Sequence, residues 1–429
     1  MIRVYLDWNV YSRIETSNVS PYPELRNILL NNNRFFFPYS TAHIIDINTS
    51  YLKVGWENVQ GHLSNLKLSN NLYLMQPFDG EIGFYFQEPS ESLRAYIQDK
   101  DSSISLEEIN ETNNPDYIDY FPETTRFIKE QDEISRQNEK IISGFQGILN
   151  AFLGDNFKQD YQKGMNISKG NLLNKKKSVG KYLDSNAVNN GYENFQDFNS
   201  DILSKVNKNP NFISELSSLF VGIDISGYKE DTNQFSSTIT DSFHCAWAST
   251  CDIFIVDDKN TFYKSIEVYK MKNISTKTFR PQGFVEYFNQ TCFQFEDGMK
   301  LINSLFDYCK STEPIGLIKN EKVYFLGEFI LDFFNVIITE NENEYIRLYK
   351  RNASNQLVLL TCEKEDLLIK INNQFGEPAL IHDNWEENGT LNSAWIYNEL
   401  EVLKLSIEKD FVVLSFIKCK RNDSSEIRE

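Results

Sequence analysis

Four aspartates lie at positions typical of metal-binding carboxylates, either just after an apolar run or in a segment with helical spacing. Asp7 closes the run I-R-V-Y-L-D, and Asp258 closes D-I-F-I-V-D-D. Asp46 lies in S-T-A-H-I-I-D and Asp241 in T-I-T-D-S-F-H. Carboxylate oxygens suit Mg²⁺ or Mn²⁺, which can activate water and neutralise charge on a phosphate. Taken alone, an aspartate after a strand is usually a turn residue or helix cap, so the hypothesis depends on bringing the four together.

The elements needed to bring them together are predicted near the start of the chain. Residues 2–6 and 34–38 form short apolar runs, and residues 23–31 have helical spacing. Ser40 is a predicted N-cap for the helix that contains Asp46. This alternation is typical of βαβ units and a parallel sheet.

The same alternation returns later, with a helix predicted to open at Asp241 and a strand at residues 252–256. In open α/β sheets, sites form at the carboxyl ends of the strands. We therefore expect an α/β fold in which Asp7 and Asp258 project into one crevice. Asp46 and Asp241 are expected on helices beside that crevice.

Residues 69–237 are polar and mainly helical in tendency, which predicts an inserted helical subdomain within a first domain of residues 1–290. This stretch contains a locally basic segment, for which two interpretations remain open: a solvated surface tract or a substrate phosphate-binding patch. Two histidines near the aspartates are likewise either packed helical residues or substrate contacts. The candidate substrate-binding residues are Lys175, Lys176, Lys177, Lys181, His43 and His244.

Residues 291–429 are predicted to form a separate α+β domain with a mainly antiparallel sheet. A helix at residues 297–309 is followed by several short alternating runs, and residues 401–420 read as two strands joined by a turn. We expect this domain to regulate activity or to bind a protein partner.

The composition limits the class of protein. With 43 Lys and Arg against 61 Asp and Glu, the net charge of −18 argues against broad attraction to polyanions. Six cysteines without C-x-x-C spacing and scattered histidines argue against a zinc site and predict free thiols. No signal-peptide pattern or long apolar run is present, which predicts a cytoplasmic protein without a membrane span.

The aspartate motifs together resemble those of the PIN-like nuclease superfamily. L-D-W-N-V resembles the opening motif, and F-F-F-P-Y-S-T-A-H-I-I-D resembles the second, with Asp46 where the family commonly has Glu. T-D-S-F-H-C-A-W-A resembles the third motif, and F-I-V-D-D-K-N-T-F resembles the last, with Val256 in place of Thr. The resemblance covers roughly residues 1–50 and 238–284.

The resemblance implies a three-layer α/β/α fold with a parallel sheet and Mg²⁺- or Mn²⁺-dependent endonuclease activity. RNA is the expected substrate, less often single-stranded DNA. Asp7, Asp46, Asp241 and Asp258 would hold the metal, with Asn9 as a supporting polar residue. By analogy, such a protein would suit a toxin or effector of bacterial stress or phage defence.

Two alternatives remain open. A catalytically degenerate PIN-like domain would bind nucleic acid or protein without cutting. A haloacid-dehalogenase-like phosphatase would use the aspartate of L-D-W-N as its nucleophile, with Asn9 at the position where those enzymes normally carry a second Asp.

Overall fold

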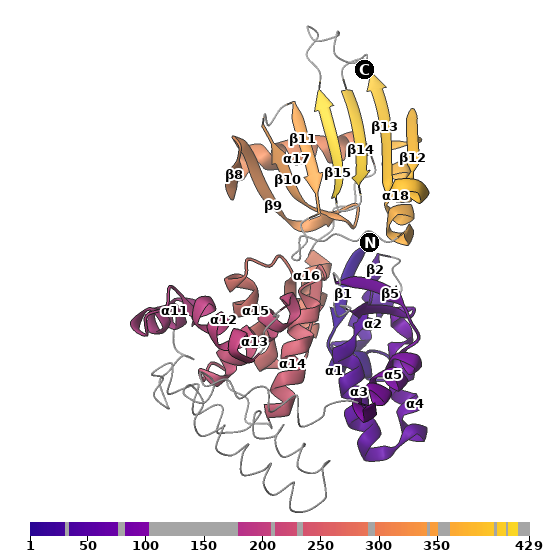
Figure 1. The fold of residues 1–429 in the computed structure, drawn as a ribbon. Helices are drawn as coiled ribbons and strands as arrows, with labels where there is room; N and C mark the ends of the chain where they lie inside the picture. Colours follow the sequence, from indigo (N-terminus) through magenta and orange to yellow (C-terminus); the bar gives the residue numbers. More distant parts are fainter. Residues whose placement is uncertain are drawn as a thin grey trace, which may run out of the picture.

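The computed structural model describes residues 1–30, 34–75, 82–102, 179–206, 211–229, 235–290, 297–340, 344–350, 361–398, 401–408 and 411–418. Figure 1 shows two units: an antiparallel sheet, in orange and yellow, above a mixed unit of helices and a parallel sheet. We call these the C-terminal unit (α17 to β15) and the N-terminal unit (β1 to α16). The N-terminus of the chain lies at their junction.

A four-stranded parallel sheet forms the centre of the N-terminal unit, in the order β2-β1-β6-β7. Its strands are β1 (Ile2–Leu6), β2 (Phe35–Phe36), β6 (Ile253–Ile255) and β7 (Lys277–Phe279). Every residue of β1 and β6 is buried, as expected for parallel strands covered on both faces. The predicted α/β class is confirmed.

Helices cover the two faces of this sheet and build two hydrophobic cores against it. The early helices are α1 (Trp8–Ile14), α2 (Tyr22–Leu30), α3 (Thr41–Val54), α4 (Trp56–Asn65), η1 (Leu66–Ser69) and α5 (Pro89–Ser102). The later helices are α11 (Val179–Asn189), α12 (Phe195–Val206), α13 (Phe212–Ile225), α14 (Phe235–Ala248), α15 (Lys259–Met271) and α16 (Pro281–Gln290).

The described part of residues 69–237 is integrated with the sheet and is not purely helical. Strands β4 (Leu72–Met75) and β5 (Gly83–Phe86) join β3 (Tyr39–Ser40) in a small three-stranded sheet. Helices α11 to α13 share one hydrophobic core with Tyr5 of β1 and Phe254 of β6. These helices therefore help to form the core of the N-terminal unit.

The predicted helix start at Asp241 is wrong, because α14 begins six residues earlier at Phe235. Thr240-Asp241 resembles an N-terminal helix signal, but α14 continues upstream and packs along α13. Tertiary packing of this kind overrides a local capping preference. In contrast, the predicted N-cap at Ser40 is confirmed: its side chain accepts a hydrogen bond from the amide of Ala42.

The mainly antiparallel sheet that the sequence predicts in the C-terminal unit is confirmed: it has eight strands, in the order β12-β13-β14-β15-β11-β10-β9-β8. Helices α17 (Gly298–Ser311) and α18 (Thr361–Phe375) pack against it, and α19 (Trp385–Asn388) is a single turn. The strands are β8 (Gly316–Ile318), β9 (Glu321–Ile330), β10 (Phe334–Thr339), β11 (Tyr345–Tyr349), β12 (Leu380–Asn384), β13 (Thr390–Asn398), β14 (Glu401–Glu408) and β15 (Phe411–Lys418).

Buried ion pairs join the two units at the amino ends of the central strands. Arg3 of β1 forms a two-pronged pair with Glu363 of α18, with both side chains almost fully buried. Asp252, immediately before β6, pairs with Lys350 at 2.8 Å and also accepts a hydrogen bond from the Arg3 amide. The C-terminal unit is therefore anchored to the strands that lead to Asp7 and Asp258.

Two general features of the described residues bear on the sequence predictions. None of their helices has the length and apolar character needed to cross a membrane. Their cysteines, Cys245, Cys251, Cys309 and Cys362, are free thiols.

Candidate active site

Asp7 stands at the carboxyl end of β1, where the chain turns into α1. Its amide donates to the carbonyl of Ile255, 2.9 Å away, which ties this end of β1 to β6. The side chain is buried, and Oδ2 has no hydrogen-bond partner among the described residues. Burial, with a smaller contribution from the charge of Asp46, raises the pKa of Asp7 to about 6, against the opposing effects of the His244 charge and of the backbone amides of Trp8 and Asn9. A buried carboxylate oxygen without a hydrogen-bond partner is stabilised by a proton or by a nearby cation.

His244 of α14 lies between two of the predicted carboxylates. Its Nε2 donates to Asp46 Oδ2 at 2.7 Å and lies 3.9 Å from Asp7 Oδ1. Burial acts to lower the pKa of His244, but the hydrogen bond to Asp46 and the charges of Asp46, Asp7 and Asp241 together raise it. These neighbours therefore favour the protonated, positively charged form of His244.

Asp241 lies one helical turn before His244 on α14, facing the same cluster. Burial, together with the charges of Asp7 and Asp258, raises the pKa of Asp241 to about 8, while the charges of His244 and Lys264 oppose this shift. These interactions place Asp241 within electrostatic range of both strand-end aspartates. The proton is therefore retained on Asp241 near neutral pH unless another cation replaces it.

Asp258 caps the helix that follows β6. Its Oδ1 accepts a hydrogen bond from the amide of Thr261 at 2.7 Å, which fixes the carboxylate at the N-terminus of α15. The neighbouring Asp257 is held differently, by ion pairs with Arg13 and Arg280 and a hydrogen bond from Tyr22. The charge of Asp258 contributes to the raised pKa of Asp241.

The cluster of Asp7, Asp46, Asp241 and Asp258 is called the aspartate site below. Its donor chemistry suits a hard divalent cation, because all four side chains offer carboxylate oxygens and one of those oxygens is buried without a partner. Within the described part of the chain, no three His, Cys, Asp or Glu side chains are arranged as a preformed metal chelate. His244 would compete with a cation for Asp46.

The remaining predicted residues lie in different environments. Asn9 is exposed on α1, in the turn that follows Asp7. Lys181 is exposed on α11, which Figure 1 shows at the far side of the molecule from α1 and α3. The other three candidate lysines, Lys175, Lys176 and Lys177, lie outside the described residues.

His43 has a structural role in place of the predicted substrate contact. It is fully buried, its Nδ1 accepts from the amide of Ser40 at 3.0 Å, and its Nε2 lies 2.8 Å from the carbonyl of Leu6. These contacts assign the ring proton to Nε2. Burial keeps the pKa of His43 well below its usual value, so the ring is neutral.

Two further side chains that influence this cluster, Tyr5 and Lys264, were missed from the sequence. The Tyr5 hydroxyl lies 3.0 Å from His244 Nδ1 and 2.6 Å from Ser40 Oγ, so it orients the histidine. Strand alternation offered a signal, since residues 5 and 7 share a face of β1. Lys264, fully buried and paired with Asp224 at 2.8 Å, carried no such signal.

A comparison of the chain with protein-family models, with curated proteins and with solved structures finds no match.

Proposed function

We propose that this chain is a metal-dependent endonuclease that hydrolyses phosphodiester bonds in RNA. The observation that carries the proposal is Asp7, whose buried carboxylate has an unpartnered oxygen at the carboxyl end of β1. Its electrostatic links run to Asp46, and through Asp241 to Asp258. The choice of RNA comes from the resemblance of these motifs to PIN-like nucleases.

In this proposal the four carboxylates of the aspartate site hold Mg²⁺ or Mn²⁺. An ion held there would supply the positive charge that activates water as a nucleophile and that stabilises charge on the phosphate. Asp241, with its pKa raised to about 8, keeps its proton near neutral pH unless positive charge is supplied, whereas Asp7, with a pKa of about 6, is mostly ionised there. His244 holds Asp46 in place, and Tyr5 orients His244. The C-terminal unit is proposed to regulate this activity or to bind a partner.

Cleavage of end-labelled RNA and single-stranded DNA with Mn²⁺ tests the proposal. Asp7→Asn and Asp258→Asn are expected to lower the cleavage rate by at least about 100-fold, because each removes a carboxylate needed for charge stabilisation. Asp257→Asn is the matched control, since Asp257 is adjacent but bound to arginines. Its cleavage rate should stay within about threefold of wild type. Equal rates in all four proteins, or no cleavage with either metal, would sink the proposal.

The hydrogen bond between His244 and Asp46 favours a second candidate, a nucleic-acid-binding module without catalysis. In that case one carboxylate of the set is permanently occupied by the histidine. RNA retained in a gel-shift assay with Mn²⁺, with no cleavage and no effect of Asp7→Asn on affinity, would select this candidate.

A further inference from the structure

Strand β12 forms one edge of the eight-stranded sheet, and its outer side has no partner strand among the described residues. Its inner side pairs with β13, in a register that runs from Leu380 opposite Ala394 to Asn384 opposite Thr390. Because only one side of the strand is paired, a row of backbone N–H and C=O groups along the other side points outward. All residues of β12 are exposed. This edge can therefore accept a further strand through backbone hydrogen bonds.

The side chains of β12 are apolar where an edge strand is usually protected by charge, proline or a bulge. Leu380 and Ile381 are 56% and 57% exposed and point to opposite faces of the sheet. Leu380 shares its face with Ile396 of β13, which is also exposed. The one acidic residue of the strand, Asp383, lies near its end, 3.7 Å from the ammonium of Lys364. Apolar contacts can therefore add to the backbone hydrogen bonds of a further strand.

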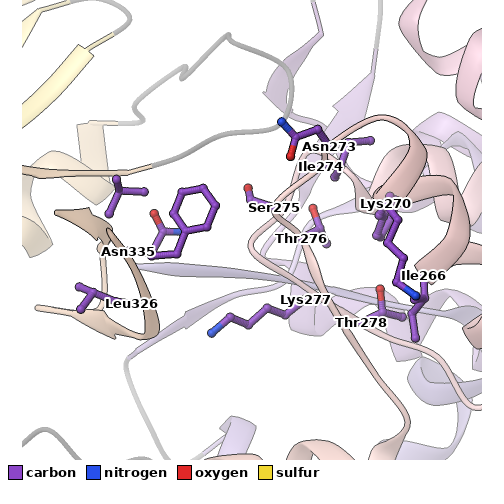
Figure 2. Close-up of a pocket in the computed structure, with 13 residues that line it drawn as sticks. Ile266, Lys270, Asn273, Ile274, Ser275, Thr276, Lys277, Thr278, Leu326 and Asn335 are labelled. Atoms are coloured by element: carbon purple, nitrogen blue, oxygen red, sulfur yellow. The ribbon is translucent and has the colours of Figure 1, made fainter. Parts of the chain in front are cut away.

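The opposite edge strand, β8, is less suited to strand addition. It has three residues, Gly316–Ile318, and it ends at a turn in which Lys319 has a φ of 49°. A short strand that contains glycine offers little to a partner strand. The neighbouring strands β9 and β10 already face the N-terminal unit across a cavity of about 460 Å³, where Figure 2 shows Lys277 opposite Leu326. Strand β12 lies at the other end of the strand order.

The sequence of β12 is complementary to itself when two copies run antiparallel about a two-fold axis at Ile381. In that register the two Ile381 side chains lie opposite each other, and Leu380 lies opposite His382 of the second copy. Asp383 lies opposite Ala379, so no like charges oppose each other, an arrangement that would be destabilising. An axis at His382 would instead place Asp383 opposite Ile381 and pair the two histidines. Apolar pairing therefore selects the register centred on Ile381.

We propose that β12 pairs antiparallel with β12 of a second copy of this chain, which joins the two sheets into one of sixteen strands, eight from each copy. The same surface is used by both copies, so the assembly closes as a dimer and does not extend into a filament. An interface built on one short strand is small, so the dimer dissociates with a Kd of roughly 1–100 µM. Because each copy carries a net charge of −18, added salt strengthens the association. This inference does not depend on nuclease activity.

Analytical ultracentrifugation of the full chain between about 1 and 300 µM tests the inference. The dimer fraction should rise across this range, and it should be larger in about 500 mM than in about 50 mM NaCl. Ile381→Lys places two ammonium groups opposite each other and should weaken association at least about tenfold. Leu317→Lys is the matched control, because Leu317 is similarly exposed, at 68%, but lies on β8. Its Kd should match wild type within about twofold, and both exposed sites should tolerate lysine without loss of the fold.

Cysteine cross-linking tests the register of the dimer. Ile381→Cys should form a disulfide-linked dimer under mild oxidation, because residues directly opposite have Cβ atoms about 4.5–5.5 Å apart. His382→Cys should not, because its two copies would lie more than about 7 Å apart. Wild type is the blank for the native cysteines. A monomer at every concentration, unchanged association in Ile381→Lys, loss of association in Leu317→Lys, or cross-linking of His382→Cys without that of Ile381→Cys would overturn the inference.

Discussion

The two ends of strand β1 each bury a charged side chain, and the two charges differ in how far their surroundings neutralise them. At the amino end, the Arg3 guanidinium meets the Glu363 carboxylate through two hydrogen bonds of 2.9 and 2.5 Å. At the carboxyl end, Asp7 keeps one oxygen without a partner in the described structure, and burial raises its pKa. The Arg3 charge is neutralised within the chain and holds two units together, whereas the Asp7 charge is only partly compensated, as the proposed metal site requires.

The largest expected effect on stability comes from removing Glu363, the partner of Arg3 at the amino end of β1. Glu363→Ala leaves Arg3 buried without its partner and should lower the free energy of unfolding by about 3–5 kcal/mol in urea denaturation. The double variant Arg3→Met/Glu363→Met removes both charges and should recover most of that loss. A double variant as unstable as the single one would contradict the role assigned to this pair.

Removing the charge of Asp7, at the carboxyl end of β1, should have the opposite effect and stabilise the folded protein. A carboxyl pKa raised from 3.8 to about 6 means that ionised Asp7 destabilises the folded state, by on the order of 2–3 kcal/mol. This penalty is absent below about pH 4, grows as pH rises, and is complete above about pH 6. Asp7→Asn should therefore raise the free energy of unfolding at pH 7.5 and leave it nearly unchanged at pH 4. A lower free energy of unfolding for Asp7→Asn than for wild type at pH 7.5 would contradict the assignment of Asp7 as a destabilising buried charge.

Divalent cations should stabilise the folded protein by neutralising negative charge at the carboxyl end of β1. Asp7 and Asp241 have raised pKa values, so the apo protein loses stability as pH rises, and the stabilising charge of His244 is lost in the same direction. Mn²⁺ at about thirtyfold its Kd should add roughly 2 kcal/mol at pH 8 and less at pH 5. Thermal unfolding measures both values. Equal stabilisation of Asp7→Asn would show that the ion binds elsewhere.

The smallest expected effect on stability comes from Tyr5, which lies between Arg3 and Asp7 on β1. Tyr5→Phe removes the hydroxyl that contacts His244 and Ser40, and it should lower the free energy of unfolding by about 1 kcal/mol. Because the His244 ring loses its orienting contact, the pKa of His244 measured by NMR should also change. An unchanged pKa would show that Asp46 alone orients the ring.

Local features of the fold were predictable because their causes are local. The apolar run of β1 and the cap at Ser40 depend on a few neighbouring residues, so the sequence contains the information needed. The start of α14 was not predictable in this way, because packing along α13 extends it beyond its apparent cap.

The candidate site was only partly predictable for the same reason. The positions of Asp7 and Asp258 at strand ends follow from hydrophobic patterning. The hydrogen bond between His244 and Asp46 joins residues 198 positions apart, and no local signal specifies it. The proton distribution within the cluster depends on burial, which only the folded chain defines.

The pairing of β1 with β6 also determines when the site can form during synthesis. Arg3 and Asp252, which hydrogen-bond at the start of these strands, are 249 residues apart. A ribosome that adds roughly 5–20 residues per second needs on the order of 10–50 s to proceed from Asp7 to Asp258. During that interval the nascent chain carries β1 and β2 without β6, and a chain that stops early never completes the aspartate site.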